Sequence, residues 1–292
     1  TDTKIMELTE LLNEKILPNV NKPSRYTGGE YNSYKMKNGA IEYCLAFPDT
    51  YEVGMSHLGA KIIYGMLNDT EDINCERVFA PLNDMRDMLR KYDQPLYSLE
   101  SFKPLSEFDF IGFSLQYEMC ITTVLYMLDL GKIPLRAEDR DESFPIIMGG
   151  GPCTVNPKPF EQFFDVMYVG EAEEHLLEII RAKNSTSNKD EFLSEVSKIE
   201  GVYVPKYPKD KVVRAFVRNM DRSYFPEKII VPYLEPIHDR IAVEVMRGCP
   251  RGCRFCQAGS IYRPVRQKSL DRILEQADTL LKTTGYEGVS LL

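Results

Sequence analysis

Short apolar runs alternate with amphipathic segments between residues 40 and 185. Expected strands are Ile41–Phe47, Arg77–Ala80, Asp109–Leu115, Pro145–Met148 and Asp165–Val169. The segments between them have helical periodicity, and the expected helices are His57–Leu67, Leu82–Lys91, Tyr117–Leu130 and Ala172–Arg181. This order of elements is typical of an α/β fold with a parallel sheet, which we assign to residues 36–185.

The flanking segments have other patterns. Residues 1–35 hold a helical stretch over 4–17, and residues 186–236 combine a short helix with several prolines. Short β-like runs at Gly201–Val204, Val212–Val217 and Lys228–Val231 predict a connector with a hairpin. Residues 237–292 contain a strand-like run at 241–246, a helix from Ser269, and an apolar strand pattern at 288–292.

Composition limits the function classes. The 292 residues allow about two domains. A net charge of −8 argues against a general nucleic-acid or membrane surface, although it does not exclude nucleic acid as a partner. No apolar run is long enough to span a bilayer, and no signal peptide is recognisable. Four scattered cysteines have the pattern of reduced structural thiols in a cytoplasmic protein: Cys44, Cys75, Cys120 and Cys153.

The remaining cysteines are the strongest chemical signal. Cys249, Cys253 and Cys256 follow the strand-like run with the spacing C-x₃-C-x₂-C. Three thiolates can hold three irons of a 4Fe–4S cluster and leave the fourth iron open to an outside ligand. A zinc site with His238 as fourth ligand is one alternative, although zinc sites more often use two separated pairs. A short disulfide with one odd thiol is another.

The cysteine spacing resembles that of the radical S-adenosylmethionine (SAM) enzymes. The resemblance implies that Cys249, Cys253 and Cys256 hold a 4Fe–4S cluster, and that the aromatic Phe255 lies near the adenine of SAM. It implies reductive cleavage of SAM to a 5′-deoxyadenosyl radical, with electrons from a protein such as flavodoxin or ferredoxin. Residues 237–292 then resemble the start of a partial TIM barrel. No further catalytic residue can be named.

The same resemblance places a SAM-binding segment just beyond Leu292. We therefore expect the chain to be an N-terminal fragment of a longer protein, inactive by itself. Residues from about 240 onward should then lack partners for their apolar faces and be mobile, rearranged or paired with another chain.

Basic residues surround the cysteines. Arginines 247, 251, 254, 263 and 266 and Lys268 lie in a stretch that has no acid between Glu244 and Asp271. We expect a cationic collar that offsets the charge of an anionic cluster and of the SAM carboxylate. A solvated basic loop is the alternative.

A second resemblance concerns residues 36–185. The loop from Asp49 to Gly54 is similar to the D-x-H-x-x-G motif of cobalamin-binding domains of the methionine-synthase type, which have a flavodoxin- or Rossmann-like fold. Later loops supply the serine and glycine motifs of such domains. The cobalamin-site residues that this implies are Gly54, Ser114, Leu115, Gly149, Gly150 and Gly151.

Tyr51 stands where the family has its cobalt-ligating histidine. A phenol with a pKa near 10 is a poor cobalt ligand. Two interpretations remain. Cobalamin binds without a protein ligand and makes the protein a methyltransferase, or the domain is a degenerate scaffold that docks a partner or substrate.

Other titratable residues have simpler explanations. His57 and His175 lie near helix starts, where caps and packing roles are common. Glu171, Glu173 and Glu174 crowd the start of an expected helix, where acids complement the helix dipole.

Overall fold

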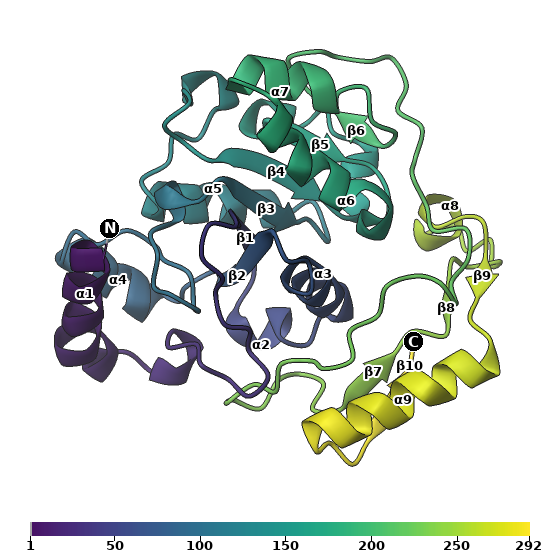
Figure 1. Cartoon of the computed structure of the whole chain (residues 1–292), viewed down its shortest axis with the longest axis horizontal. Coiled ribbons are helices and arrows are strands. Elements are labelled where there is room, and N and C mark those ends of the chain that lie inside the picture. Colours follow the sequence, from purple (N-terminus) through teal and green to yellow (C-terminus); the bar gives the residue numbers. More distant parts are fainter. Residues whose placement is uncertain (1) are drawn as a thin grey trace.

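The computed structural model describes residues 2–292 as an α/β domain followed by a smaller β–α–β unit (Figure 1). The helices are α1 Asp2–Leu11, α2 Tyr51–Gly54, α3 Leu58–Asn68, α4 Asn83–Lys91, α5 Cys120–Leu130, α6 Ala172–Arg181, α7 Lys189–Val196, α8 Ala258–Ile261 and α9 Leu270–Thr284. The strands are β1 Ile41–Phe47, β2 Ile73–Phe79, β3 Phe110–Ser114, β4 Ile146–Gly150, β5 Val166–Tyr168, β6 Val202–Tyr203, β7 Ile241–Val243, β8 Met246–Arg247, β9 Arg266–Gln267 and β10 Val289–Leu291.

The main sheet has the strand order β2-β1-β3-β4-β5-β6. Strands β1 to β5 are parallel, and β6 pairs antiparallel with β5. The order 2-1-3-4-5 is that of the flavodoxin-like doubly wound sheet, so the predicted α/β fold is confirmed. In such sheets ligands bind beyond the carboxyl ends of the strands, where the chain direction across the sheet reverses. That point lies between β1 and β3.

Helices cover both faces of this sheet, each over its own core. One core joins the N-terminal segment, α4 and α5 to residues such as Ala46 and Ile111. The other joins α3, α6 and α7 to residues such as Leu45 and Phe110. Alternate residues of a strand point to opposite faces, so a strand covered on both faces is apolar throughout its length.

Most predicted elements have the observed bounds to within a few residues, and β1 and α6 match fully. Strand β2 begins at Ile73 rather than Arg77 because the polar Asn74 and Glu76 within it are buried and hydrogen-bonded, which hides the apolar pattern. Helix α5 begins at Cys120 rather than Tyr117.

The predicted hairpin in the connector is wrong. Its segments bridge other parts of the chain: Ala215 bridges Gly170, and Val231 bridges Tyr31. Prolines interrupt this stretch and cannot donate to a strand ladder, so short single bridges replace a hairpin. The connector thereby lies along the first domain and ties it to the C-terminal unit.

The C-terminal unit consists of β7, α9 and β10, with Val289 paired in parallel to Ile241. Helix α9 is capped at its N-terminus by Ser269, whose hydroxyl accepts a hydrogen bond from Arg272 N, and at its C-terminus by Gly285, which has a positive φ of 75°. Its buried Leu280 packs with Ile241, with Ile62 of α3 and with connector residues. The expectation that this unit lacks partners is therefore wrong for the face that carries Ile241 and Leu280, whereas Leu274 and Leu291 are exposed.

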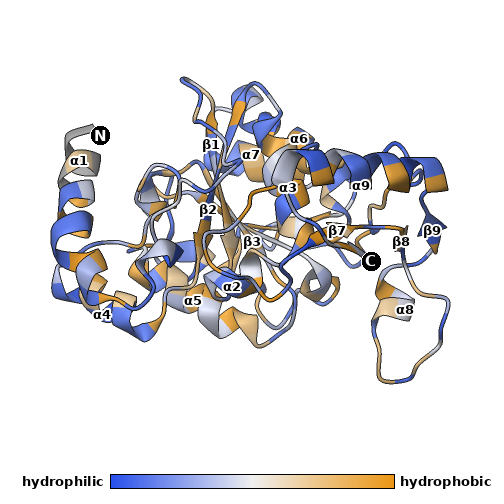
Figure 2. Ribbon diagram, turned by 90° about the horizontal axis from the view of Figure 1, so that it is seen from below, coloured by the Kyte–Doolittle hydropathy of each residue, from blue (hydrophilic) through white to orange (hydrophobic). Residues whose placement is uncertain are grey.

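Figure 2 shows that the segment carrying α8 projects from the body of the molecule. Among residues 2–292, no helix is both long and apolar enough to cross a membrane.

Candidate functional site

The three clustered cysteines lie on the loop between β8 and β9, the projecting segment of Figure 2. The two short strands pair antiparallel, with Arg247 opposite Arg266, and form the stem of this loop. Cys249 is partly exposed, and Cys253 and Cys256 are exposed. Phe255 is 92% exposed, and Cys256 N donates a 3.1 Å hydrogen bond to Cys253 O. We call residues 248–265 the cysteine loop.

The donor set of the cysteine loop suits a cluster with an open iron. Its three sulfurs are free thiols on one accessible loop, and thiolates are the ligands that iron–sulfur clusters use. Within residues 2–292, the structure does not gather three metal-ligating side chains into one site, so the sulfurs are not preassembled. His238, the fourth ligand of the zinc alternative, is exposed. Its backbone N–H donates a 3.3 Å hydrogen bond to Ser56 Oγ.

The predicted cationic collar is wrong for three of its six basic residues, because these three are paired with acidic side chains. Arg251, Arg254 and Arg263 are exposed on the cysteine loop. Arg247 and Arg266, however, bind the buried carboxylate of Glu171, which the first domain supplies. Lys268 Nζ lies 3.7 Å from Glu244 and 3.1 Å from the side-chain oxygen of Gln276. Glu244 is close in the sequence, whereas Glu171 and Glu173 come from the first domain and could not be recognised as partners from the sequence.

Of the two lone histidines, His57 is a helix cap and His175 pairs with a neighbour on its own helix. His57 caps α3, where its Nδ1 accepts a 3.1 Å hydrogen bond from Ala60 N, and burial lowers the pKa of its imidazole. His175 lies 3.0 Å from Glu178 on the surface of α6. The Nδ1 atoms of both histidines make their hydrogen bonds within their own helices and not to the cysteine loop.

The loops with the cobalamin-like motifs lie together at the carboxyl ends of β1, β3 and β4, as predicted from their order. Tyr51 does not face outward there. It is buried, and its hydroxyl donates a 2.9 Å hydrogen bond to Glu30 Oε1. Burial and the nearby Glu30 carboxylate raise the pKa of the Tyr51 phenol. Tyr51 is therefore engaged inside the domain, away from any ligand above the sheet.

The four glycines of these loops differ in how much space surrounds them. A Cβ on Gly54 would lie 2.2 Å from the ring of Phe79, so this glycine is required by packing. Gly149 is also closely packed, with Leu115 and Phe164 about 3 Å from its Cβ position. Gly151 has a φ of 102°, and its Cβ would lie 2.6 Å from Leu115 O. Only Gly150, among these four, has open space where a Cβ would lie.

Ser114 and Leu115 complete this edge. The Ser114 hydroxyl is buried and accepts a 2.8 Å hydrogen bond from Gln116. Leu115 is fully buried, and its backbone N–H donates a 2.7 Å hydrogen bond to Gly150 O. These residues shape the backbone of the edge more than they offer side chains to a ligand.

A cavity of 350 Å³ joins this edge to the cysteine loop. It is lined by Glu118, Ile121, Cys153, Val155, Asn156, Pro159, Phe160 and Gln257. Gln257 directly follows Cys256, and the other lining residues follow β3 and β4. The carboxyl edge of the sheet and the end of the cysteine loop thus share one hollow.

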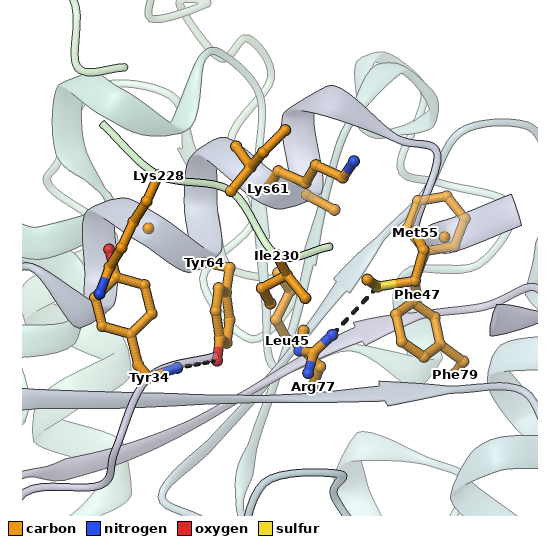
Figure 3. Close-up of a pocket in the computed structure, with 14 residues that line it drawn as sticks. Tyr34, Leu45, Phe47, Met55, Lys61, Tyr64, Arg77, Phe79, Lys228 and Ile230 are labelled. Atoms are coloured by element: carbon orange, nitrogen blue, oxygen red, sulfur yellow. Dashed lines mark hydrogen bonds between the residues drawn. The ribbon is translucent and has the colours of Figure 1, made fainter. Parts of the chain in front are cut away.

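A second cavity lies on the α3 side of the sheet and is shown in Figure 3. It has an accessible volume of 20 Å³, which is about the space of one water molecule. Arg77 lies on its wall, where Nη1 is 3.2 Å from the sulfur of Met55 and the guanidinium stacks over Tyr64. Burial lowers the pKa of the nearby Lys61 to about 8. The cavity is too small for a cofactor.

Arg77 is the centre of a buried ionic cluster that sequence patterns missed. Its Nη2 lies 2.7 Å from Glu30 and its Nε 2.6 Å from Glu100, and all three side chains are buried. Their positions in the sequence give no common signal, because the three residues come from an N-terminal loop, β2 and the segment after α4. The cluster holds Glu30 beneath Tyr51 and so determines where the Tyr51 side chain points.

Comparisons with known proteins agree with this geometry. Residues 59–205 match the family model described as radical SAM proteins, N-terminal, and residues 243–292 match that of the radical SAM superfamily. An uncharacterised protein of Methanocaldococcus jannaschii is 30% identical over 263 residues, which cover 88% of this chain and 49% of that protein. The chain therefore spans about half the length of this curated relative.

The fold also resembles solved structures. Two structures of the radical SAM methyltransferase TsrM from Kitasatospora setae, one with tryptophan and a SAM analogue and one with cobalamin and a [4Fe-4S] cluster, superpose with a TM-score of 0.50. They are 12% identical in sequence, and the match covers 86% of this chain and 47% of theirs. At this identity the likeness concerns the fold.

A doubly wound domain, followed by a β–α–β unit that carries a three-cysteine loop, defines the class. The chain belongs to the radical SAM proteins. This family implies a 4Fe–4S cluster and SAM as cofactors.

Proposed function

We propose that this chain carries the cluster-binding part of a radical SAM enzyme, in which Cys249, Cys253 and Cys256 hold a 4Fe–4S cluster. The observation that carries the proposal is the placement of three free thiols on one stem-bound loop that the family model includes. When bound, the cluster and SAM supply a 5′-deoxyadenosyl radical. The activity and substrate of the whole protein belong to this proposal as well, because the chain spans about half of its relative.

The residues of the cysteine loop have separate roles in this proposal. The exposed ring of Phe255, next to Cys256, is free to stack on the adenine of SAM. The exposed Arg251, Arg254 and Arg263 offset negative charge on a cluster and on the SAM carboxylate. Electrons come from a reductant protein such as flavodoxin or ferredoxin. A cytoplasmic location is part of the proposal, since seven free thiols suit a reducing compartment.

The first domain supports a finer proposal, cobalamin-dependent methyl transfer. Gly150 offers an unobstructed backbone at the sheet edge, and the 350 Å³ cavity connects that edge to Gln257 beside the cysteine loop. An open glycine lets a bulky ligand approach the backbone closely. Since Tyr51 is hydrogen-bonded to Glu30, its phenol would not be available to cobalt at the position of the family's histidine. The alternative is a scaffold that docks a partner or substrate without cobalamin.

The central test is anaerobic reconstitution of the full-length protein with iron and sulfide, followed by SAM and dithionite. We expect four irons per protein, absorbance typical of a 4Fe–4S cluster, and formation of 5′-deoxyadenosine. A Cys249/Cys253/Cys256→Ser variant should lose the absorbance, whereas a Cys44→Ser variant should keep it because Cys44 is buried in the first domain. Unchanged iron and sulfide in the triple variant would refute the assignment, and zinc without sulfide would favour the zinc alternative.

Titration with hydroxocobalamin separates the two functions of the first domain. Saturable binding with a spectral shift supports a cofactor role, and its loss in Gly150→Leu would place the ligand at the open glycine. No binding by the wild-type protein favours the scaffold. Thermal unfolding of Gly150→Leu serves as the control for a folding defect.

A further inference from the structure

Glu171 is a buried carboxylate that binds arginines from three separate segments. Its two oxygens accept 2.7 Å hydrogen bonds from the Nη1 and Nη2 atoms of Arg266. Arg247 Nη1 lies 3.0 Å away and Arg214 Nη1 3.3 Å away. The backbone N–H of Val217 donates a further 2.9 Å bond. One side chain of the first domain thus connects the connector and both strands of the loop stem.

The stem needs this carboxylate for an electrostatic reason. Arg247 lies directly opposite Arg266 in the β8–β9 ladder. Like charges in directly opposed positions of a ladder destabilise the pairing. The stem has two paired residues per strand, so few backbone bonds oppose that repulsion. Glu171 lies against both guanidinium groups, and Glu173 and Glu244 add contacts of 2.7 Å each to Arg247.

The helix dipole does not explain why the Glu171 carboxylate is buried against the stem. It is the N-cap residue of α6, yet its side chain makes no capping hydrogen bond to the helix. Its carboxylate points instead to the stem, and its exposed fraction is 7%. A buried carboxylate is costly unless it is paired, and here each oxygen is paired with arginine. Its position is therefore accounted for by the stem arginines.

We propose that Glu171 is a positioning residue that fixes the cysteine loop on the first domain. Arg247 lies two residues before Cys249, and Gly248 between them has a φ of 97° and packs its backbone against the carbonyl oxygen of Tyr262. The clamp therefore acts at the base of the segment that carries the thiols. It sets where the loop lies relative to the cavity that Gln257 shares with the first domain. This inference rests on the proposed cluster-binding function of that loop.

The first test needs no cofactor. Hydrogen exchange is measured on the metal-free chain for wild type, for Glu171→Gln, and for Glu178→Gln as a control on the same helix, where the Glu178 side chain is 60% exposed. We expect roughly tenfold faster exchange in peptides covering residues 244–268 of Glu171→Gln, with unchanged rates in β1 to β5. Equal rates in the stem would overturn the proposal. Faster exchange over the whole main sheet would show a general stability role and overturn it too.

The second test uses the reconstituted full-length protein. Glu171→Gln should retain the iron content of wild type, because all three thiols remain, but give a broadened electron paramagnetic resonance signal of the reduced cluster. Glu171→Asp, which keeps the charge, should recover a sharper signal. Identical spectra for wild type and Glu171→Gln would contradict the positioning role. If wild type loads no iron, the proposed function fails, while the exchange measurement still decides the clamp.

A second variant guards against misfolding. If Glu171→Gln does not fold, Arg266→Gln removes the bidentate partner and leaves the carboxylate paired with Arg247 and Arg214. The proposal predicts a localised increase of exchange at residues 244–268 in this variant too, smaller than in Glu171→Gln because the repulsion between Arg247 and Arg266 is removed as well. An unchanged stem in a folded Arg266→Gln protein would overturn it.

Discussion

The phenol of Tyr51 donates a 2.9 Å hydrogen bond to the carboxylate of Glu30, in the interior of the first domain. Arg77 donates hydrogen bonds to both oxygens of the same carboxylate. The residue that replaces a cobalt-ligating histidine in the resembling motif is therefore a structural residue here. Its side chain ties the loop after β1 to an N-terminal segment.

This hydrogen bond predicts a measurable loss of stability in Tyr51→Phe. The variant leaves Glu30 with one donor fewer while preserving the ring, so the free energy of unfolding should fall by about 1–2 kcal/mol. Urea denaturation at pH 7 measures it. Tyr117→Phe is the control, because Tyr117 is 48% exposed and should change stability little. A Tyr51→Phe protein as stable as wild type would show that the bond contributes nothing net.

Arg77→Met should destabilise the fold strongly at neutral pH. It leaves Glu30 and Glu100 buried without their cation, a situation that costs about 3–5 kcal/mol. Arg86→Met is the control, since its ion pair with Asp87 is on the surface.

The pH dependence of the Arg77→Met deficit has a definite sign. Burial by itself raises the pKa of the Glu30 carboxyl. The charge of Arg77, together with the hydrogen bonds to this carboxyl, outweighs that effect and holds the pKa below its ordinary value of 4.5. The wild-type stabilisation is present above that ordinary value and is lost as pH falls through the lowered pKa. Protonation also relieves the unpaired Glu30 carboxylate of the variant. The difference between the two proteins should shrink from pH 7 to pH 4, and a difference that grows would contradict the assignment.

The glycine loop offers a matched pair of substitutions. Gly151→Ala should lower the free energy of unfolding by about 1–3 kcal/mol or more, because φ is 102° and the new methyl meets Leu115 O. Gly150→Ala should be tolerated, because space is open there and φ is not in the left-handed region. Thermal unfolding of both variants checks this. Equal losses would mean that the open face of Gly150 is filled in solution.

Lys61 should limit stability at neutral pH. Burial lowers its pKa to about 8 from 10.5, so between these values the unfolded chain binds more protons than the folded chain. The stability contributed by this group therefore rises as pH rises from 8 to 10.5 and is lowest below 8. Lys61→Met should gain roughly 1–2 kcal/mol at pH 7, and the gain should fade toward pH 10.5. Urea denaturation at several pH values measures this, and a gain independent of pH would contradict the lowered pKa.

Local signals in the sequence were sufficient for the main architecture. The alternation of apolar runs and amphipathic helices predicted the parallel sheet, since β1, β3, β4 and β5 are apolar enough to stand out. The cysteine spacing identified the family because Cys249, Cys253 and Cys256 lie close together along the chain. Strand β2 was recognised only in part, since its Asn74 and Glu76 are polar residues satisfied by distant partners.

The candidate site depended on contacts between distant residues. The sequence by itself determined which residues could bind a cluster, where strands and helices form, and the order of the ligand-side loops. Only the tertiary structure decided that Tyr51 turns inward to Glu30, that Gly150 is the open glycine, and that Glu171 pairs with two arginines 76 and 95 residues away. Periodicity and motifs report local preference, whereas buried charges are located by the partners that packing brings to them.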